Sequence, residues 1–526
     1  MVPTLTLRAT RERAALVARG RALLAGAALF AAFCALLAFV QYGTPHLADN
    51  DGFYHMRMAQ LMREQGLTPR FTWLPLTILD EARFYDHHML YHVYLALFTG
   101  DGSEAALIAG AKAASVALPA LAFTAIWWLL RGAGVGWAWA WALGLGAVSE
   151  AFLYRMSMPR AQSASLLMLA LALHWLLRRR HALLLPLGFA YVWLYNAFPL
   201  LLLLAGAYAA ASWLTGRRLE WRAPAYAAAG LSLGLLANPY FPANLRFIAS
   251  HLAPKFGALE SGVGNEWYPY QTWTLVENSG GALALWLLGV FALGWRGRRF
   301  DRATLTAFLL SVAFGLMLFK SRRFVEYFPP FALIFAALAI GGRALAPPAP
   351  LSRAREKGEV TGIVAHLPAP VATGERPGVR IFALLALAAM LALTLPAARE
   401  TMARARPAET YADASRWLRA NTPPGSTVFQ SDWDDFPRLF FYNTANVYVI
   451  GLDPTYLQLR DARLFDEWVA ISRGEVEAPG AAIRERFGAS YAISDLRHTG
   501  FLRRAARDPR MREVYRDAFA VIFEIR

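Results

Sequence analysis

Acidic, histidine and arginine side chains gather in residues 46–60, HLADNDGFYHMRMAQ, directly after the first long apolar run of the chain. Asp51 precedes a helix-compatible run, and aspartate is a preferred residue at the N-cap of a helix. The helix dipole and the free N–H groups would also keep such a carboxylate ionised. Because an ionised carboxylate can bind a divalent metal or accept a proton, this segment is compatible with a structural cap or with an active site.

Histidines form a second candidate site in residues 84–98, FYDHHMLYHVYLALF. His88 and His92 are four residues apart, so they would share a helix face and could bind a metal, with Asp86 close by in the sequence. The alternative is an amphipathic helix at the membrane surface, with its histidines and tyrosines at the level of the lipid head groups.

Two pairs of arginines lie where an apolar run begins or ends. Arg322 and Arg323 precede the apolar residues 324–335, and Arg155 and Arg160 precede the apolar residues 164–177. A guanidinium group binds phosphate well through its planar fork of donors. The alternative is an arginine that only extends along the lipid surface towards water.

A third group of acids surrounds a tryptophan in SDWDDFP, which follows the strand-like residues STVFQ. Trp433, Asp434 and Asp435 stand directly before a predicted helix that has Pro437 in its first turn, where proline is tolerated. Asp434 or Asp435 could cap that helix, or the three residues could contact a ligand.

The composition indicates a polytopic membrane protein. Of 526 residues, 57% are hydrophobic and only 17% are charged, and the apolar residues form runs long enough to cross a bilayer. The net charge of +16 does not indicate nucleic-acid binding, because the arginines concentrate in short loops beside the apolar runs, as the positive-inside rule describes. The single cysteine, Cys34, excludes an intramolecular disulfide.

We predict about eleven transmembrane helices, with the N-terminus in the cytoplasm as an uncleaved signal anchor. An odd number of spans then places the C-terminus outside. The predicted spans are 22–41, 105–130, 134–153, 161–177, 182–196, 198–214, 223–240, 281–295, 303–319, 326–345 and 379–397.

The predicted fold class is a polytopic α-helical membrane domain, residues 1–397, followed by a small extracytoplasmic α/β domain, residues 398–526. The membrane domain has outer loops at 42–104 and 241–280 and a cytoplasmic linker at 343–378. Because the predicted spans carry almost no acids, whereas the outer segments are rich in acids and aromatics, we expect chemistry at the outer membrane boundary. A transporter would place polar groups near the midplane instead.

The segment NDGFYHMRMAQ resembles the motif after the first transmembrane helix of oligosaccharyltransferase catalytic subunits, especially archaeal ones. These enzymes belong to the GT-C class of membrane glycosyltransferases. Asp51, Phe53, Tyr54, His55 and Arg57 fit the motif. The resemblance implies that Asp51 belongs to the metal and acceptor site, and it implies a GT-C-like fold of about eleven transmembrane helices.

The resemblance also assigns residues by their position along the chain. The implied roles are donor-phosphate binding for Arg322 or Arg323, linkage of the acceptor and metal sites for Glu277, and acceptor recognition for Trp433, Asp434 and Asp435. Glu266 lies in the same loop as Glu277, and either glutamate could equally be a solvated loop acid.

The chain departs from the family pattern at two places. Gln162 and Ala164 stand where a second pair of acids should complete the metal site. In the family motif Trp-Trp-Asp-Tyr-Gly, Trp433 and Asp434 match, but Asp432 replaces the first tryptophan and Asp435-Phe436 replaces Tyr-Gly. Two alternatives follow for the cofactor. Either Mg²⁺ or Mn²⁺ binds with Asp51 as a ligand, or the reaction is metal-independent and Arg155 and Arg160 neutralise the donor phosphate.

The expected function is transfer of a sugar from a polyprenyl phosphate or diphosphate to a glycan, lipid or protein acceptor on the outer face of the cytoplasmic membrane. The alternatives are a flippase of lipid-linked glycans and a non-catalytic relative. Asp51 is the expected base. The residues expected to shape the catalytic site with it are His55, Arg57, Asp86, His88 and Glu277.

Overall fold

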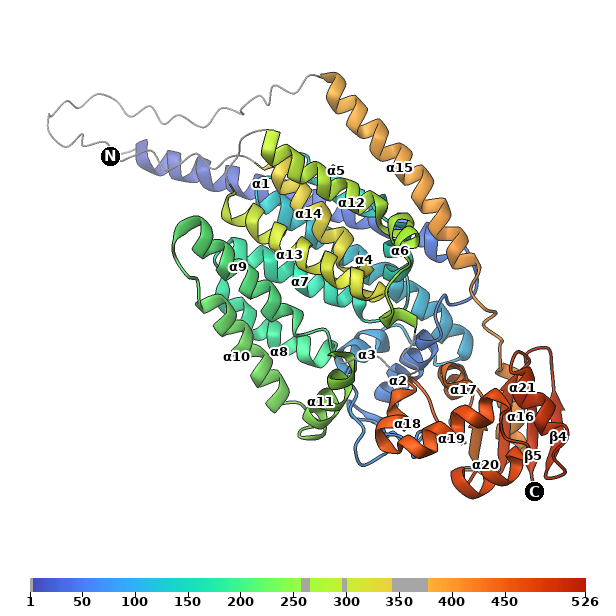
Figure 1. The fold of residues 1–526 in the computed structure, drawn as a ribbon. Coiled ribbons are helices and arrows are strands. Elements are labelled where there is room, and N and C mark those ends of the chain that lie inside the picture. The colour runs from blue at the N-terminus through green and yellow to red at the C-terminus, as the bar shows by residue number, and fades with distance from the viewer. Residues whose placement is uncertain (1–2, 257–264, 296–299, 343–376) are drawn as a thin grey trace.

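The computed structural model describes residues 3–256, 265–295, 300–342 and 377–526. A bundle of apolar helices forms the larger part, and the C-terminal α/β domain packs against one end of it (Figure 1). The predicted architecture, a bundle of apolar helices with a small C-terminal α/β domain, is therefore confirmed.

Within the described residues, five helices have the length and composition to cross a membrane. They are α1 (Pro3–Gln41, apolar from Gly20), α4 (Glu104–Gly132), α12 (Thr272–Trp295), α13 (Arg302–Lys320) and α15 (Pro377–Ala403). Shorter helices complete the bundle: α7 (Gln162–Leu177), α8 (Leu184–Leu194), α9 (Leu200–Gly216), α10 (Arg222–Leu236) and α14 (Phe328–Gly341). The side chains of α14 are buried along nearly its whole length, between α12 and α13.

The predicted span at 134–153 is wrong as a single helix. It is divided into α5 (Ala138–Leu143), the 3₁₀ turn η1 (Gly144–Gly146) and α6 (Glu150–Met156). Ser149 has an extended backbone, and its Oγ accepts from the backbone N–H of Phe152, which starts a new helix. The last predicted span also ends later than expected, because α15 continues to Ala403.

Short helices occupy the end of the bundle that faces the α/β domain. They are α2 (Asp51–Gln65), α3 (Met89–Ala96), α11 (Ala243–Phe256) and the 3₁₀ turns η3 (Asn265–Trp267) and η4 (Arg322–Glu326). A further 3₁₀ turn, η2 (His181–Leu183), connects α7 to α8. In Figure 1, α2 lies between the bundle and α17 of the α/β domain, with which it is in contact.

The α/β domain has a five-stranded sheet in the order β2-β1-β3-β5-β4. β1 is parallel to β2 and β3, whereas β5 is antiparallel to β3 and β4. The strands are β1 (Thr427–Gln430), β2 (Val447–Tyr448), β3 (Tyr491–Asp495), β4 (Met511–Arg516) and β5 (Ala520–Ile525). The helices are α16 (Ala412–Asn421), η5 (Trp433–Asp435), α17 (Phe436–Tyr442), α18 (Thr455–Arg460), α19 (Ala462–Arg473), α20 (Pro479–Phe487) and α21 (Thr499–Ala505).

Arg438 of α17 fastens the α/β domain to the start of α2. Its side chain is 1% exposed, and its guanidinium donates to Oδ1 of Asn50 at 2.8 Å and to the carbonyl of Pro407 at 2.7 Å. The same group lies 4.3 Å from the ring centre of Phe53. The loop that carries Asn50 is therefore held in place by the α/β domain.

We expect Arg438→Met to destabilise this contact by about 2–4 kcal/mol, because buried acceptors would lose their donor. The measurement is the apparent melting temperature of the purified protein. Arg512→Met is the matched control, since Arg512 is largely exposed and pairs with Glu524 on the sheet surface. Equal melting temperatures for the two variants would contradict the docking role of Arg438.

Candidate active site

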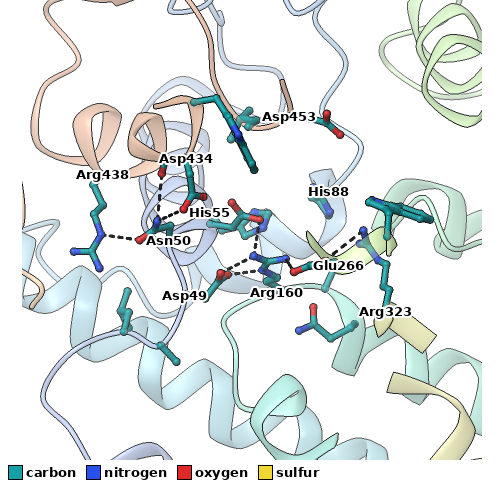
Figure 2. A pocket seen from close by; sticks show the side chains of 18 of the residues that line it. Asp49, Asn50, His55, His88, Arg160, Glu266, Arg323, Asp434, Arg438 and Asp453 are labelled. Atoms are coloured by element: carbon teal, nitrogen blue, oxygen red, sulfur yellow. Dashed lines mark hydrogen bonds and ion pairs between the residues drawn. The ribbon is translucent and has the colours of Figure 1, made fainter. Parts of the chain in front are cut away.

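A polar cavity of about 770 Å³ lies where the α/β domain meets the end of the helix bundle (Figure 2). Segments far apart in the sequence line it, including the start of α2, the loop before α3, the start of α7, η3, η4 and η5. Its carboxylates are Asp49, Asp51, Glu266, Asp432, Asp434 and Asp453. Its arginines are Arg160, Arg323, Arg404, Arg406 and Arg438.

Arg160 lies at the centre of the carboxylates. It binds both oxygens of Asp49, and its Nη2 is 3.1 Å from Oδ2 of Asp51. Its Nη1 donates to Oε1 of Glu266 at 2.8 Å. The turn that carries Arg160 can approach α2 closely because Gly52 has no side chain. A Cβ at this position would lie only 2.2 Å from Cγ of Pro159.

Glu266 joins the arginines of three segments. Nη1 of Arg155 donates to it at 2.6 Å, and Nη1 of Arg323 is 3.8 Å away. Burial disfavours the charged form of Glu266, but Arg155, Arg160 and Arg323 outweigh burial and hold the pKa of Glu266 well below its ordinary value. Glu266 is therefore an ionised carboxylate that positions the guanidinium groups.

Asp51 is the first residue of α2 and does not cap it. Asn50 precedes the helix with helical backbone angles and makes no side-chain cap bond, so capping by Asp51 is excluded. Burial, opposed by Arg160 but assisted by Asp49, raises the pKa of Asp51 to about 7. The expectation that the helix terminus keeps Asp51 fully ionised is therefore wrong. Near neutral pH the carboxyl exchanges a proton readily.

A buried chain of hydrogen bonds leads from Asp86 to the cavity. Oδ2 of Asp86 is 2.7 Å from Nδ1 of His92, and Nε2 of His92 is 2.8 Å from Nδ1 of His55. With Asp86 as acceptor, His92 donates its Nδ1–H and accepts at Nε2, so His55 donates its Nδ1–H. Burial lowers the pKa of His55 well below its ordinary value. A neutral His55 thus keeps its Nε2 lone pair for the cavity that this residue lines.

The helix of residues 89–96 is not a metal site built on His88 and His92. Both ring nitrogens of His92 are used, by Asp86 and by His55, so His92 has none left for a metal. His88 lines the cavity and accepts no hydrogen bond at its buried Nδ1 among the described residues. Burial lowers the pKa of His88 as well, so this side chain is neutral.

No protein-family model matches the chain, and no curated protein does. Solved structures do match it in fold. The apo oligosaccharyltransferase of Archaeoglobus fulgidus superposes with a TM-score of 0.63 at 14% identity, over 92% of this chain and 71% of that one. The chain has the GT-C fold.

Two further GT-C structures agree. ArnT from Cupriavidus metallidurans, bound to undecaprenyl phosphate, matches with a TM-score of 0.53 at 16% identity, over 94% of this chain and 97% of that one. The arabinofuranosyltransferase AftD from mycobacteria matches with a TM-score of 0.54 at 15% identity, over 95% of this chain and 40% of that one. The resemblance found in the sequence is confirmed at the level of the fold.

The structure brings together about half of the site residues predicted from the sequence. Those that line the cavity are Asp51, His55, His88, Arg160, Arg323, Trp433 and Asp434. Those that do not are Arg57, Asp86, Arg155, Glu277, Arg322 and Asp435. Asp86 and Arg155 still contact cavity residues from behind, through His92 and Glu266 respectively.

The other four predicted residues that do not line the cavity are located elsewhere in the structure. Arg57 donates to the carbonyl of Phe441 in α17. Glu277 is exposed in α12, so Glu266 is the glutamate of this loop that lines the cavity. Arg322 donates to the carbonyl of Pro269. Asp435 is buried in the α/β domain.

The acids around Trp433 are also arranged differently from expectation. Asp435 stands at the N-cap position of α17, but its side chain makes no cap bond. The side-chain cap bond in this segment belongs to Asp432, which accepts from the backbone N–H of Asp434 at the start of η5. Oδ2 of Asp434 accepts from the side-chain amide of Asn50 at 2.8 Å. Burial, assisted by Asp432, raises the pKa of Asp434 to about 6.

Asp49 and Glu266 line the cavity and bind Arg160, and neither role was predicted from the sequence. Asp49 stands two residues before Asp51 but outside the family motif, and Glu266 is one of three acids in the predicted loop 241–280. Their common partner Arg160 is over 100 residues away from each (111 and 106). The local composition contains no signal that could choose between Glu266 and Glu277.

Proposed function

We propose that this protein is a membrane glycosyltransferase that moves a sugar from a polyprenyl-linked phosphate donor to an acceptor. The observation that carries the proposal is the presence of Asp51 and Arg323 in one cavity at the end of a GT-C helix bundle. A proton acceptor and a phosphate ligand are the two groups that this transfer requires.

Solved GT-C structures support a lipid-linked donor. The Archaeoglobus fulgidus oligosaccharyltransferase has been seen with a dolichol-phosphate, and ArnT with undecaprenyl phosphate. The cavity here lies at the end of the bundle, where a head group on a membrane lipid could enter. We infer a multi-pass protein of the cytoplasmic membrane whose N-terminus is cytoplasmic and whose α/β domain is outside.

The reaction balances with the groups present. An acceptor hydroxyl or amide attacks C1 of the donor sugar and passes its proton to the carboxylate of Asp51. The bond between C1 and the phosphate oxygen breaks, and its electron pair stays on that oxygen. The guanidinium of Arg323 stabilises the charge that develops on the leaving phosphate.

The position of Arg323 suits this role. The hydroxyl of Tyr195 accepts from its Nη2, and its guanidinium lies 5.1 Å from the ring centre of Trp267. The backbone N–H of Arg322 in η4 donates to the carbonyl of Tyr268, directly after η3, at 3.1 Å. This hydrogen bond holds the two segments together. Arg323 is thus oriented before any donor arrives.

The acceptor would contact the α/β domain through Trp433 and Asp434, which both line the cavity. Figure 2 shows Asp434 across the cavity from Arg323. The acceptor is a glycan, a lipid or a protein. Asparagine-sequon recognition is not favoured, because Asp432 and Asp435 replace the first tryptophan and the tyrosine of the family motif.

The test uses purified protein in liposomes with a radiolabelled polyprenyl-linked sugar and fractionated membrane acceptors. We expect labelled product and an equal amount of polyprenyl phosphate or diphosphate. If the labelled donor only crosses the bilayer and no polyprenyl phosphate or diphosphate is released, the protein is a flippase and the proposal fails.

Asp86→Asn should lower the transfer rate about tenfold or more and alter its pH profile. An asparagine amide can donate to His92, which would reverse the hydrogen-bond chain and place a proton on the cavity-facing nitrogen of His55. Asp86→Glu should restore part of the rate. The control is Asp101→Asn in the same outer loop, where the carboxylate accepts hydrogen bonds from Ser103 at the protein surface. An unchanged pH profile in Asp86→Asn would refute the relay.

A further inference from the structure

Seven ionisable groups form one network in the wall of the cavity and directly behind it. Arg160 contacts three carboxyl groups, and Glu266 and Arg155 connect the remaining members to it. The carboxylates are Asp49, Asp51, Glu266 and Glu326, and the guanidinium groups are Arg155, Arg160 and Arg323. Apart from Asp51, three carboxyl groups therefore face three guanidinium groups.

Arg160 fills the space between the carboxylates that a metal ion would need. A divalent ion requires oxygen ligands at about 2.0–2.6 Å. Here the oxygens of Asp49, Asp51 and Glu266 are directed at guanidinium nitrogens, as the dashed lines in Figure 2 show for Asp49 and Glu266. The planar fork of Arg160 binds Asp49 through two parallel bonds, a geometry that a single point charge does not provide.

The neighbouring residues complete this arrangement. Gln162 stands where a further acid would be expected, and its amide donates to the backbone carbonyl of Arg155 at 2.7 Å. Gln162 therefore adds no negative charge and helps to hold the arginine segment. Glu326 lies behind Arg155 and does not line the cavity, although one of its oxygens is buried without a partner among the described residues.

A divalent metal does not fit these residues, and we propose that the guanidinium of Arg160 takes its place between Asp49, Asp51 and Glu266. If the protein is the proposed transferase, on which this inference rests, its sugar transfer needs no divalent metal. Removal of Arg160 would uncover an acidic site that binds a divalent cation.

The first test is metal binding, which does not depend on activity. Mn²⁺ binding to the purified protein is followed by electron paramagnetic resonance. The wild-type protein should show no saturable site that depends on Asp49; binding at the separate group Asp432, Asp495 and His498 would survive Asp49→Asn. Arg160→Ala should gain an additional Mn²⁺ site, and the double variant Arg160→Ala/Asp49→Asn should lose that additional site. Arg404→Ala, which removes a cavity arginine that pairs with Glu400 and none of these carboxylates, should not gain a site.

A saturable Mn²⁺ site in the wild-type protein that Asp49→Asn abolishes would overturn the proposal, and this measurement needs no Arg160 variant to fold.

The second test is the rate of sugar transfer by the wild-type protein in EDTA. This rate should stay within about twofold of the rate in Mg²⁺, because no metal polarises the phosphate. Complete inhibition by EDTA, reversed by Mg²⁺ or Mn²⁺, would also overturn it. If no transfer is seen at all, the proposed function fails while the metal-binding result still decides this inference.

Discussion

Replacing Asp51 with asparagine should reduce sugar transfer about 10²–10⁴-fold, the contribution expected from a general base. The substitution keeps the shape of the side chain at the start of α2 but removes its ability to accept a proton. The initial rate of product formation from a saturating donor is the measurement. Asp51→Glu should recover part of the loss, because the carboxylate returns at a slightly different distance from the acceptor.

The pH dependence of the wild-type rate provides a second check on Asp51. Burial raises the pKa of this carboxyl to about 7, and only the ionised form can accept a proton. The rate should therefore rise with pH through about 7 and level off above it. The control is Glu277→Gln, which removes an exposed carboxylate outside the cavity and should change the rate less than about twofold. Full activity in Asp51→Asn would show that another group is the base.

Arg323→Ala should lower the transfer rate about 10²–10³-fold, the usual cost of removing one charge-stabilising donor from a transition state. Arg322→Ala is a closely matched control, because it removes the same group one residue earlier. Arg322 is only half-buried, donates to the carbonyl of Pro269 and does not line the cavity. We expect less than about a twofold effect from it on the rate.

Arg323→Lys separates charge from geometry. Lysine retains a positive charge but lacks the planar fork and would not stack on Trp267 in the same way. An intermediate rate is expected. If Arg322→Ala were inactive and Arg323→Ala were active, the phosphate ligand would be Arg322 and the assignment from the cavity would be wrong.

The membrane fold was predictable because hydropathy determines which segments leave water. Most long apolar runs became helices close to their predicted positions, such as α4 and α13. Residues 134–153 were the exception, since glycines and Ser149 interrupt a run that remains apolar on average. In the α/β domain, the strand-like residues STVFQ form β1 and the predicted helix with Pro437 in its first turn is α17, whereas β4 and β5 near the C-terminus were not predicted.

The site was only partly predictable, because its geometry depends on contacts between distant segments. The motif around Asp51 indicated the right helix, and local patterns indicated Asp86 and Arg323. No local pattern could show that Arg160 would enter the space between Asp49 and Glu266, since the three residues come from three loops. Likewise the pKa of Asp51 follows from burial under the α/β domain, which the helix-terminus argument could not include.

The central claim is that this cavity cleaves a lipid-linked sugar donor with Asp51 as the base. The most direct measurement is a single turnover in nanodiscs loaded with radiolabelled polyprenyl-linked sugar and mixed with acceptor, with bound donor and released polyprenyl phosphate or diphosphate both counted. We predict that the wild-type protein releases the polyprenyl product in step with sugar transfer, and that Asp51→Asn keeps the donor bound but releases none. Equal release by both proteins, or none by the wild-type protein with an active acceptor present, would contradict the account.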